Sequence, residues 1–152
     1  MNIFNADFID FIQCLNKHKV RYLLVGGYAV IIRGYSRSTG DMDIWVEKEN
    51  LNYQSLIKAI TEFGLPSFAI PSEKFFSNDY DVFSFGRPPY AIEIMTEVRG
   101  LEFESAFNLA TLERIDSIQV RVVHINHLIM AKKAAGRHKD LNDLENLPTA
   151  ED

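Results

Sequence analysis

The sequence has a single cysteine, Cys14, among 152 residues, so it cannot form a disulfide within the chain. Its four histidines show none of the spacings typical of a zinc site. No apolar run approaches the roughly 20 residues that a bilayer-spanning helix requires. The first residues also lack the basic segment and apolar core of a secretion signal. We therefore expect a cytoplasmic protein with no membrane contact.

Positive charge is also scarce, because 16 lysines and arginines stand against 21 aspartates and glutamates, a net charge of −5. A protein that coats nucleic acid through a broad basic surface must neutralise many phosphates, so this class is disfavoured. A small basic cluster is still present near the end of the chain, at Lys132, Lys133, Arg137 and Lys139. It is compatible with a local phosphate-binding patch.

The remaining composition is that of an ordinary globular domain, with 47% hydrophobic and 24% charged residues. A chain of this length buries roughly two-thirds of its unfolded surface and needs no metal merely to fold. There is no internal repeat or long linker, so we expect one domain over residues 1–152, with a flexible tail from about 148.

Hydrophobic periodicity predicts strands that alternate with helices in the first half of the chain. The second half adds a hairpin through Gly86-Arg87-Pro88-Pro89, a shorter strand pair and two helices, after an irregular segment over 65–78. The fold class is therefore α/β (α+β), with a mixed central sheet and helices packed on it. The predicted helices cover about 7–18, 28–33, 50–63, 126–135 and 139–147, and the strands cover 20–25, 41–46, 81–85, 90–95, 111–115 and 119–123.

Three carboxylates stand out against this pattern. Asp41 and Asp43 are two residues apart on a predicted strand, so they project from the same face and repel each other. Glu93 is the lone charge in the apolar segment Tyr90-Ala91-Ile92-Glu93-Ile94-Met95. If the two strands are neighbours, the three carboxylates can hold two Mg²⁺ or Mn²⁺ ions about 4 Å apart, as enzymes of phosphoryl and nucleotidyl transfer do.

A glycine pair precedes this acidic strand. Gly26-Gly27 lets the backbone approach a ligand closely at the start of the next helix, which suits a triphosphate. Arg33, Arg37, Ser38 and Thr39 could add donors to phosphate oxygens. Each element also has an ordinary explanation, as a tight turn, a solvated Asp pair or an exposed edge-strand position. Their joint occurrence in this order favours a functional site.

The order Val25-Gly26-Gly27, thirteen residues and then Asp41-Met42-Asp43-Ile44 resembles the signature of the DNA polymerase β-like nucleotidyltransferase superfamily. A segment near the C-terminus, from Lys132 through Arg137-His138-Lys139-Asp140 to Asp143, is similar to AbiEii-type nucleotidyltransferases of bacterial toxin–antitoxin systems. The longer glycine-loop pattern shares this likeness, through Gly26, Gly27, Tyr28, Ala29, Gly34, Arg37, Thr39, Asp41 and Asp43.

The resemblance implies roles for these residues. Asp41, Asp43 and Glu93 would be the catalytic carboxylates and metal ligands, although Glu93 replaces the aspartate most common there. The residues that would contact the nucleotide are Gly26, Gly27, Arg37, Thr39, Lys132, Arg137 and Lys139. For Asp140 and Asp143 two interpretations remain open, a solvated helix surface with a capping Asp or pairing with Lys132 and Arg137.

The expected reaction is transfer of a nucleoside monophosphate from an NTP to an acceptor hydroxyl. The resemblance suggests RNA, tRNA or a protein as the acceptor, and an antitoxin or other subunit as a partner. Two alternatives stay open: a catalytically silent nucleotide-binding or antitoxin-like module, and a metal-dependent hydrolase of phosphate esters.

Overall fold

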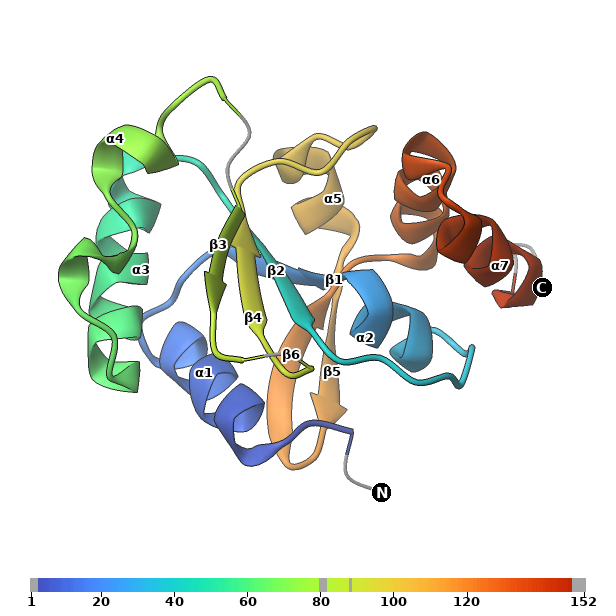
Figure 1. Ribbon diagram of the computed structural model, residues 1–152, viewed down its shortest axis with the longest axis horizontal. Coiled ribbons are helices and arrows are strands. Elements are labelled where there is room, and N and C mark those ends of the chain that lie inside the picture. Colours follow the sequence, from blue (N-terminus) through green and yellow to red (C-terminus); the bar gives the residue numbers. More distant parts are fainter. Residues whose placement is uncertain (1–2, 80–81, 88, 149–152) are drawn as a thin grey trace.

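A six-stranded mixed sheet forms the centre of the computed structural model, which describes residues 3–79, 82–87 and 89–148 (Figure 1). The strand order is β3-β4-β2-β1-β6-β5. Strand β2 is antiparallel to β1 and parallel to β4, so the two segments predicted to carry the acidic residues are neighbours. The strands are β1 (Tyr22–Val25), β2 (Met42–Val46), β3 (Val82–Phe85), β4 (Ile92–Met95), β5 (Thr111–Ile115) and β6 (Ile118–Val122).

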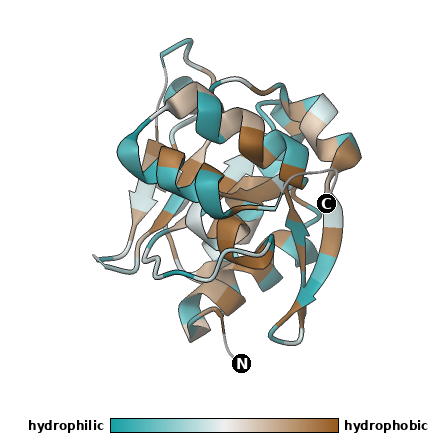
Figure 2. Ribbon diagram, turned by 90° about the vertical axis from the view of Figure 1, so that its right-hand side faces the viewer, coloured by the Kyte–Doolittle hydropathy of each residue, from teal (hydrophilic) through white to brown (hydrophobic). Residues whose placement is uncertain are grey.

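Helices cover both faces of this sheet. Figure 1 shows α1, α3 and α4 on one side, and α2, α5, α6 and α7 on the other. Figure 2, in which the side of α6 and α7 faces the viewer, shows hydrophilic and hydrophobic segments alternating along the helices. No described helix is both long and apolar enough to cross a membrane. The helices are α1 (Ala6–Lys17), α2 (Gly26–Ile32), α3 (Asn50–Phe63), η1 (Ser67–Ala69, a 3-10 helix), α4 (Ser72–Phe75), α5 (Phe103–Leu109), α6 (Ile125–Ala135) and α7 (His138–Asn146).

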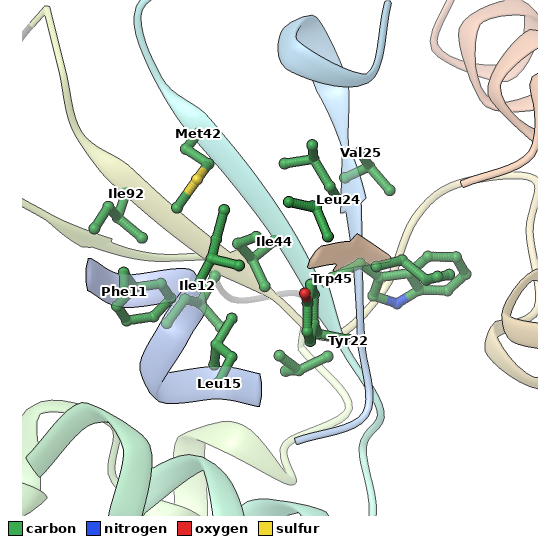
Figure 3. Close-up of a cluster of buried hydrophobic side chains, with 14 of the residues drawn as sticks. Phe11, Ile12, Leu15, Tyr22, Leu24, Val25, Met42, Ile44, Trp45 and Ile92 are labelled. Atoms are coloured by element: carbon green, nitrogen blue, oxygen red, sulfur yellow. The ribbon is translucent and has the colours of Figure 1, made fainter. Parts of the chain in front are cut away.

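Strand alternation separates the core from the face that carries the acidic residues. Leu24 and Ile44 are register partners on β1 and β2 and lie toward Phe11 and Ile12 of α1 (Figure 3). These four side chains are completely buried, and each contributes about 1.5–3 kcal/mol of hydrophobic stabilisation. Trp45 alternates to the opposite face and is buried there. The α1 side of the sheet therefore packs against α1 and forms part of the hydrophobic core.

Trp45 is fixed by two contacts on the face opposite α1. Its indole nitrogen donates a hydrogen bond to the carbonyl oxygen of Thr96 at 3.1 Å. The ring of Phe103 meets it edge to face, with ring centroids 5.1 Å apart. Helix α5, which begins at Phe103, is therefore held against the sheet by an aromatic contact between segments distant in sequence.

Local signals explain the helix limits that the sequence predicted well. Helix α3 begins after Glu49, whose carboxylate accepts hydrogen bonds from the amides of Leu51 and Asn52, and ends at Gly64 with φ of 118°. The prediction for this helix agrees with the structure at both ends. Helix α6 instead begins after His124, whose ring nitrogen accepts from the Asn126 amide, so it starts one residue before the predicted range of 126–135.

Three short elements differ from the prediction. The segment over 65–78, expected to be irregular, contains η1 and α4, and α5 was not predicted. Phe75 of α4 is completely buried and contacts the ring of Tyr53. Contacts distant in sequence, rather than a long periodic pattern, therefore stabilise these elements. The hairpin residue Pro88, the first predicted residue of β3, Asp81, and the tail over 149–152 lie outside the described residues.

Candidate active site

All ten residues predicted to bind metal or nucleotide line one cleft of about 1410 Å³. Trp45 lines the cleft, together with residues of α5 and α6 and of the region from 137 to 140. The ten residues come from five separate segments: Gly26, Gly27, Arg37, Thr39, Asp41, Asp43, Glu93, Lys132, Arg137 and Lys139. The fold therefore brings the predicted set together.

The centre of the cleft is a pair of carboxylates on adjacent strands. Asp43 of β2 and Glu93 of β4 are register partners in the parallel ladder, so their side chains stand on the same face. Desolvation by burial, and secondarily the charges of Glu93 and Asp41, raise the pKa of Asp43 to about 7. Lys139 and Lys132 act in the opposite sense and lower it. A cation at this position would relieve the repulsion.

The other two carboxylates are held by neighbouring groups. The Oδ1 atom of Asp41 accepts a hydrogen bond from the Ala91 amide at 3.1 Å, which ties the start of β2 to the start of β4. The Ser84 hydroxyl lies 3.4 Å from Oε1 of Glu93 and donates a weak hydrogen bond to it. These contacts fix both carboxylates near Asp43 without introducing a positive charge.

The donor chemistry of this cluster suits a hard divalent cation, because carboxylate oxygens are the ligands that Mg²⁺ and Mn²⁺ prefer. Within the described residues, however, no group of three or more His, Cys, Asp or Glu side chains already converges on a point that could hold a metal ion. Mg²⁺ commonly takes only one or two carboxylates from the protein and completes its shell with water and substrate phosphate. Asp43, Glu93 and Asp41 are compatible with that mode.

Each of the two glycines lies directly against a side chain of the site. Gly26 has φ of 70°, and a Cβ atom there would lie only 2.0 Å from Oδ2 of Asp43. A Cβ at Gly27 would lie 2.2 Å from the Thr39 hydroxyl. Both form the first turn of α2 directly after β1, rather than a separate turn before a helix at Tyr28 as the sequence suggested. Side chains at either position would occupy space beside Asp43 or Thr39.

The basic wall of the cleft is an ion-pair network. Arg37 makes a forked contact with Asp143 through Nε–Oδ1 at 2.7 Å and Nη2–Oδ2 at 2.9 Å. Lys132 lies 3.1 Å from carboxylate oxygens of both Asp140 and Asp143. Arg137 pairs with Asp140 at 2.7 Å. The structure thus favours the pairing interpretation of the two aspartates over a solvated helix surface, since both are buried.

Asp140 also organises the start of α7. It accepts from the Arg137 amide at 3.1 Å, as part of a capping box. Burial opposes its ionisation, but hydrogen bonds from Arg137 and Lys132 outweigh burial and lower its pKa. Lys139, the next cation along the chain, is exposed and lines the cleft, and its charge acts on Asp43.

Arg33, considered above as a phosphate donor, faces away from the cleft. Its guanidinium donates to the carbonyl oxygens of Val122 and Val123 at 3.1 and 2.9 Å and also bonds Thr111 and Glu113. It therefore joins the end of α2 to β5 and β6. The expectation for Arg33 was wrong because the sequence does not show which way a side chain at the end of α2 points.

Other residues that line the cleft were not predicted from the sequence. Glu47, Lys48, Met95, Glu97 and Arg99 also line it. An alternation of period two was present in the sequence, since Glu47 follows Asp43 by four residues and Glu97 follows Glu93 by four. Extending that alternation beyond the strand ends would have identified the two glutamates.

Comparison with known proteins agrees with this architecture. No family model matches the sequence, and no curated protein matches it. Among solved structures, a "putative nucleotidyltransferase" from Thermotoga maritima superposes with a TM-score of 0.65 over 95% of this chain and 94% of that one, at 15% sequence identity. At this identity the likeness concerns the fold. The chain thus shares with that protein a mixed α/β fold, in which helices cover both faces of a six-stranded mixed sheet.

Proposed function

We propose that the protein is a metal-dependent nucleotidyltransferase, which moves a nucleoside monophosphate from an NTP to an acceptor hydroxyl. The observation that carries this proposal is the position of Asp43. It lies beside Glu93 in register and against Gly26, in a cleft whose other wall is basic. A carboxylate pair that faces cations across one cleft suits a ligand that has both metal ions and phosphates.

In the proposed reaction the acceptor oxygen forms a bond to the α-phosphorus of the NTP. The bond from that phosphorus to the bridging oxygen breaks, and pyrophosphate leaves. The acceptor loses its proton, which a carboxylate of the Asp41, Asp43 and Glu93 cluster accepts. Catalysis of such a transfer depends mainly on positioning and on electrostatic stabilisation of the phosphoryl group.

The same three carboxylates would hold the metal, as two Mg²⁺ or Mn²⁺ ions. When bound, such ions supply Lewis-acid activation of the acceptor and neutralise charge on the leaving pyrophosphate. The raised pKa of Asp43 supports this assignment, because burial and then the charges of Glu93 and Asp41 disfavour its ionised form, and a bound cation would offset both effects.

We assign binding of the triphosphate to cations of the basic wall and to the two glycines. Lys139 is exposed to the cleft and Arg137 has a side chain that is 61% exposed, so both can reach phosphate oxygens. Gly26 and Gly27 keep the space beside Asp43 and Thr39 free of side chains, which allows close approach of a ligand.

The finer assignments rest on the sequence resemblance to AbiEii-type proteins. On that basis we extend the proposal to an RNA, tRNA or protein acceptor, to a cytoplasmic role in a toxin–antitoxin system, and to an antitoxin or other subunit as partner. These assignments lead directly to an experiment that identifies the acceptor class.

The test is incubation of wild type and the Asp41→Ala/Asp43→Ala variant with each α-labelled NTP, Mg²⁺ or Mn²⁺, and total cellular RNA plus protein. The proposal predicts label on RNA or protein with wild type only. Metal-dependent NTP binding without transfer would instead indicate the silent binding module. Release of labelled nucleotide without an acceptor would indicate a hydrolase.

A further inference from the structure

The role of Asp143 emerges from its contacts. Its carboxylate is 1% exposed and lies between two cations that come from opposite sides. Arg37 binds both oxygens through a fork, and Lys132 contacts Oδ2 at 3.1 Å. Asp143 itself is on α7, whereas Lys132 is on α6. One buried carboxylate therefore links two helices to the segment that contains Arg37.

That segment, over residues 35–41, has no helix or strand of its own. It leads directly into β2 and carries Thr39 and Asp41, which line the cleft. Arg37 also donates to the carbonyl oxygen of Ser38 at 2.9 Å, so the same guanidinium that binds Asp143 braces the local backbone. The segment is therefore tied to α7 through Arg37, and also through the hydrogen bond that the Asn142 side chain donates to the Tyr35 hydroxyl at 3.1 Å.

The geometry of the contact is suited to positioning rather than to ligand binding. A forked contact between a guanidinium and a carboxylate fixes orientation as well as distance, because two parallel hydrogen bonds must be satisfied. Arg37 and Lys132 are largely buried, with side-chain exposures of 22% and 8%. Breaking either pair would remove part of the compensation of the buried Asp143 charge, which is costly.

We propose that Asp143 is a positioning residue of the nucleotidyl-transfer site. It acts through Arg37 to hold Thr39 and Asp41 at the cleft, and through Lys132 to hold α6 against α7. Arg37 and Lys132 accordingly serve as internal braces, and Lys139 and Arg137 are the cations that meet phosphate. The inference rests on the proposed function for its catalytic consequence, but its structural part stands separately.

Asp140 provides the matched control. It is also buried and also pairs with Lys132, but its remaining contacts are with Arg137 within its own helix start. In the part of the chain that the structure describes, Asp140 makes no hydrogen bond or ion pair with the segment over 35–41. Loss of its charge should loosen the start of α7 and leave the Arg37 segment in place.

The structural test is amide hydrogen exchange of the metal-free full chain for wild type, Asp143→Asn, Arg37→Gln and Asp140→Asn. The expected result is exchange of the Tyr35 and Met42 amides, which are hydrogen-bonded at the two ends of the segment, that is faster by roughly tenfold or more in Asp143→Asn and Arg37→Gln, and unchanged in Asp140→Asn. Arg37→Gln keeps the pair between Asp143 and Lys132, so it remains informative if Asp143→Asn does not fold. Unchanged exchange of the Tyr35 and Met42 amides in both Arg37→Gln and any folded Asp143→Asn would overturn the proposal.

The catalytic test separates positioning from phosphate binding. If Asp143 and Arg37 act as one brace, both variants lose kcat by roughly tenfold to a hundredfold, with a much smaller change in KM for the NTP. A rise in KM confined to Arg37→Gln would mean that Arg37 binds phosphate directly, and it would contradict the proposal. Should wild type transfer no nucleotide at all, the proposed function fails, while hydrogen exchange still decides whether Asp143 positions the segment.

Discussion

Asp43 and Glu93 are register partners on the parallel strands β2 and β4, which sets their two carboxylates side by side on one face of the sheet. The next residues along the same strands, Ile44 and Ile94, point to the other face of the sheet and are completely buried in the core. A one-residue shift in register would exchange these two sets of side chains. The packing of the core therefore holds the acidic pair in place.

The stability of the metal-free protein should depend on pH through Asp43. Its pKa is raised to about 7 in the folded protein from 3.8, so the folded state retains a proton that the unfolded chain releases. The free energy of unfolding should consequently fall as pH rises from about 4 to about 7, and level off above that. Urea unfolding of wild type at several pH values, without divalent ions, measures this fall.

The Asp43→Asn variant should lack that part of the pH dependence and should be more stable than wild type near pH 8, by about 1–3 kcal/mol. Asp10→Asn, on the exposed surface of α1, is the matched control and should leave the pH dependence as it is in wild type. Equal pH dependence in wild type and Asp43→Asn would contradict the environment assigned to this carboxylate.

Glycine at position 26 should matter for the site as well as for the backbone. Gly26→Ala adds a Cβ within 2.0 Å of Asp43, so it must displace that carboxylate. Gly64→Ala is the control, because Gly64 also has positive φ but its added Cβ meets nothing within 4 Å. Both variants should lose on the order of 1 kcal/mol of stability. Only Gly26→Ala should lose metal-dependent NTP binding, measured by calorimetry.

Lys139 should contribute to NTP affinity through its charge. Lys139→Gln should weaken NTP binding by roughly tenfold, or about 1.4 kcal/mol. Because Lys139 lowers the pKa of Asp43, its removal should also raise that pKa further. Lys133→Gln removes an exposed charge from α6 outside the cleft lining and should change neither quantity. Similar losses in both variants would indicate a general effect of charge rather than a contact in the cleft.

Arg33 should affect stability without affecting the nucleotide. Arg33→Gln removes hydrogen bonds to β5 and β6 and should lower the free energy of unfolding by about 1–3 kcal/mol. NTP affinity, measured at a temperature where the variant is folded, should equal that of wild type. A weakened affinity would mean that Arg33 reaches the cleft after all.

Much of the fold was accessible from the sequence because its strongest signals are local. The amphipathic pattern and terminal glycine of α3 predicted both of its limits, and the alternation around Asp43 predicted the strand β2. The joint pattern of Gly26-Gly27, Asp41, Asp43 and Glu93 predicted a shared site, and all of these residues line one cleft.

What the sequence could not supply depends on contacts between distant segments. Helix α5 is stabilised by the packing of Phe103 on Trp45, and no pattern within seven residues reveals that partner. The direction of Arg33, likewise, follows from where β5 and β6 pass. The bracing of Arg37 by Asp143 spans 106 positions of sequence, so only the folded chain shows it.

The most direct measurement of the central claim is a comparison of α-labelled and γ-labelled NTP in parallel reactions of the wild-type protein with Mg²⁺ or Mn²⁺ and the acceptor mixture. Nucleotidyl transfer predicts that the α label becomes attached to an acceptor while the γ label appears in pyrophosphate, and that both signals vanish in Asp41→Ala/Asp43→Ala. Transfer of the γ label to the acceptor, or no transfer of either label, would contradict the account.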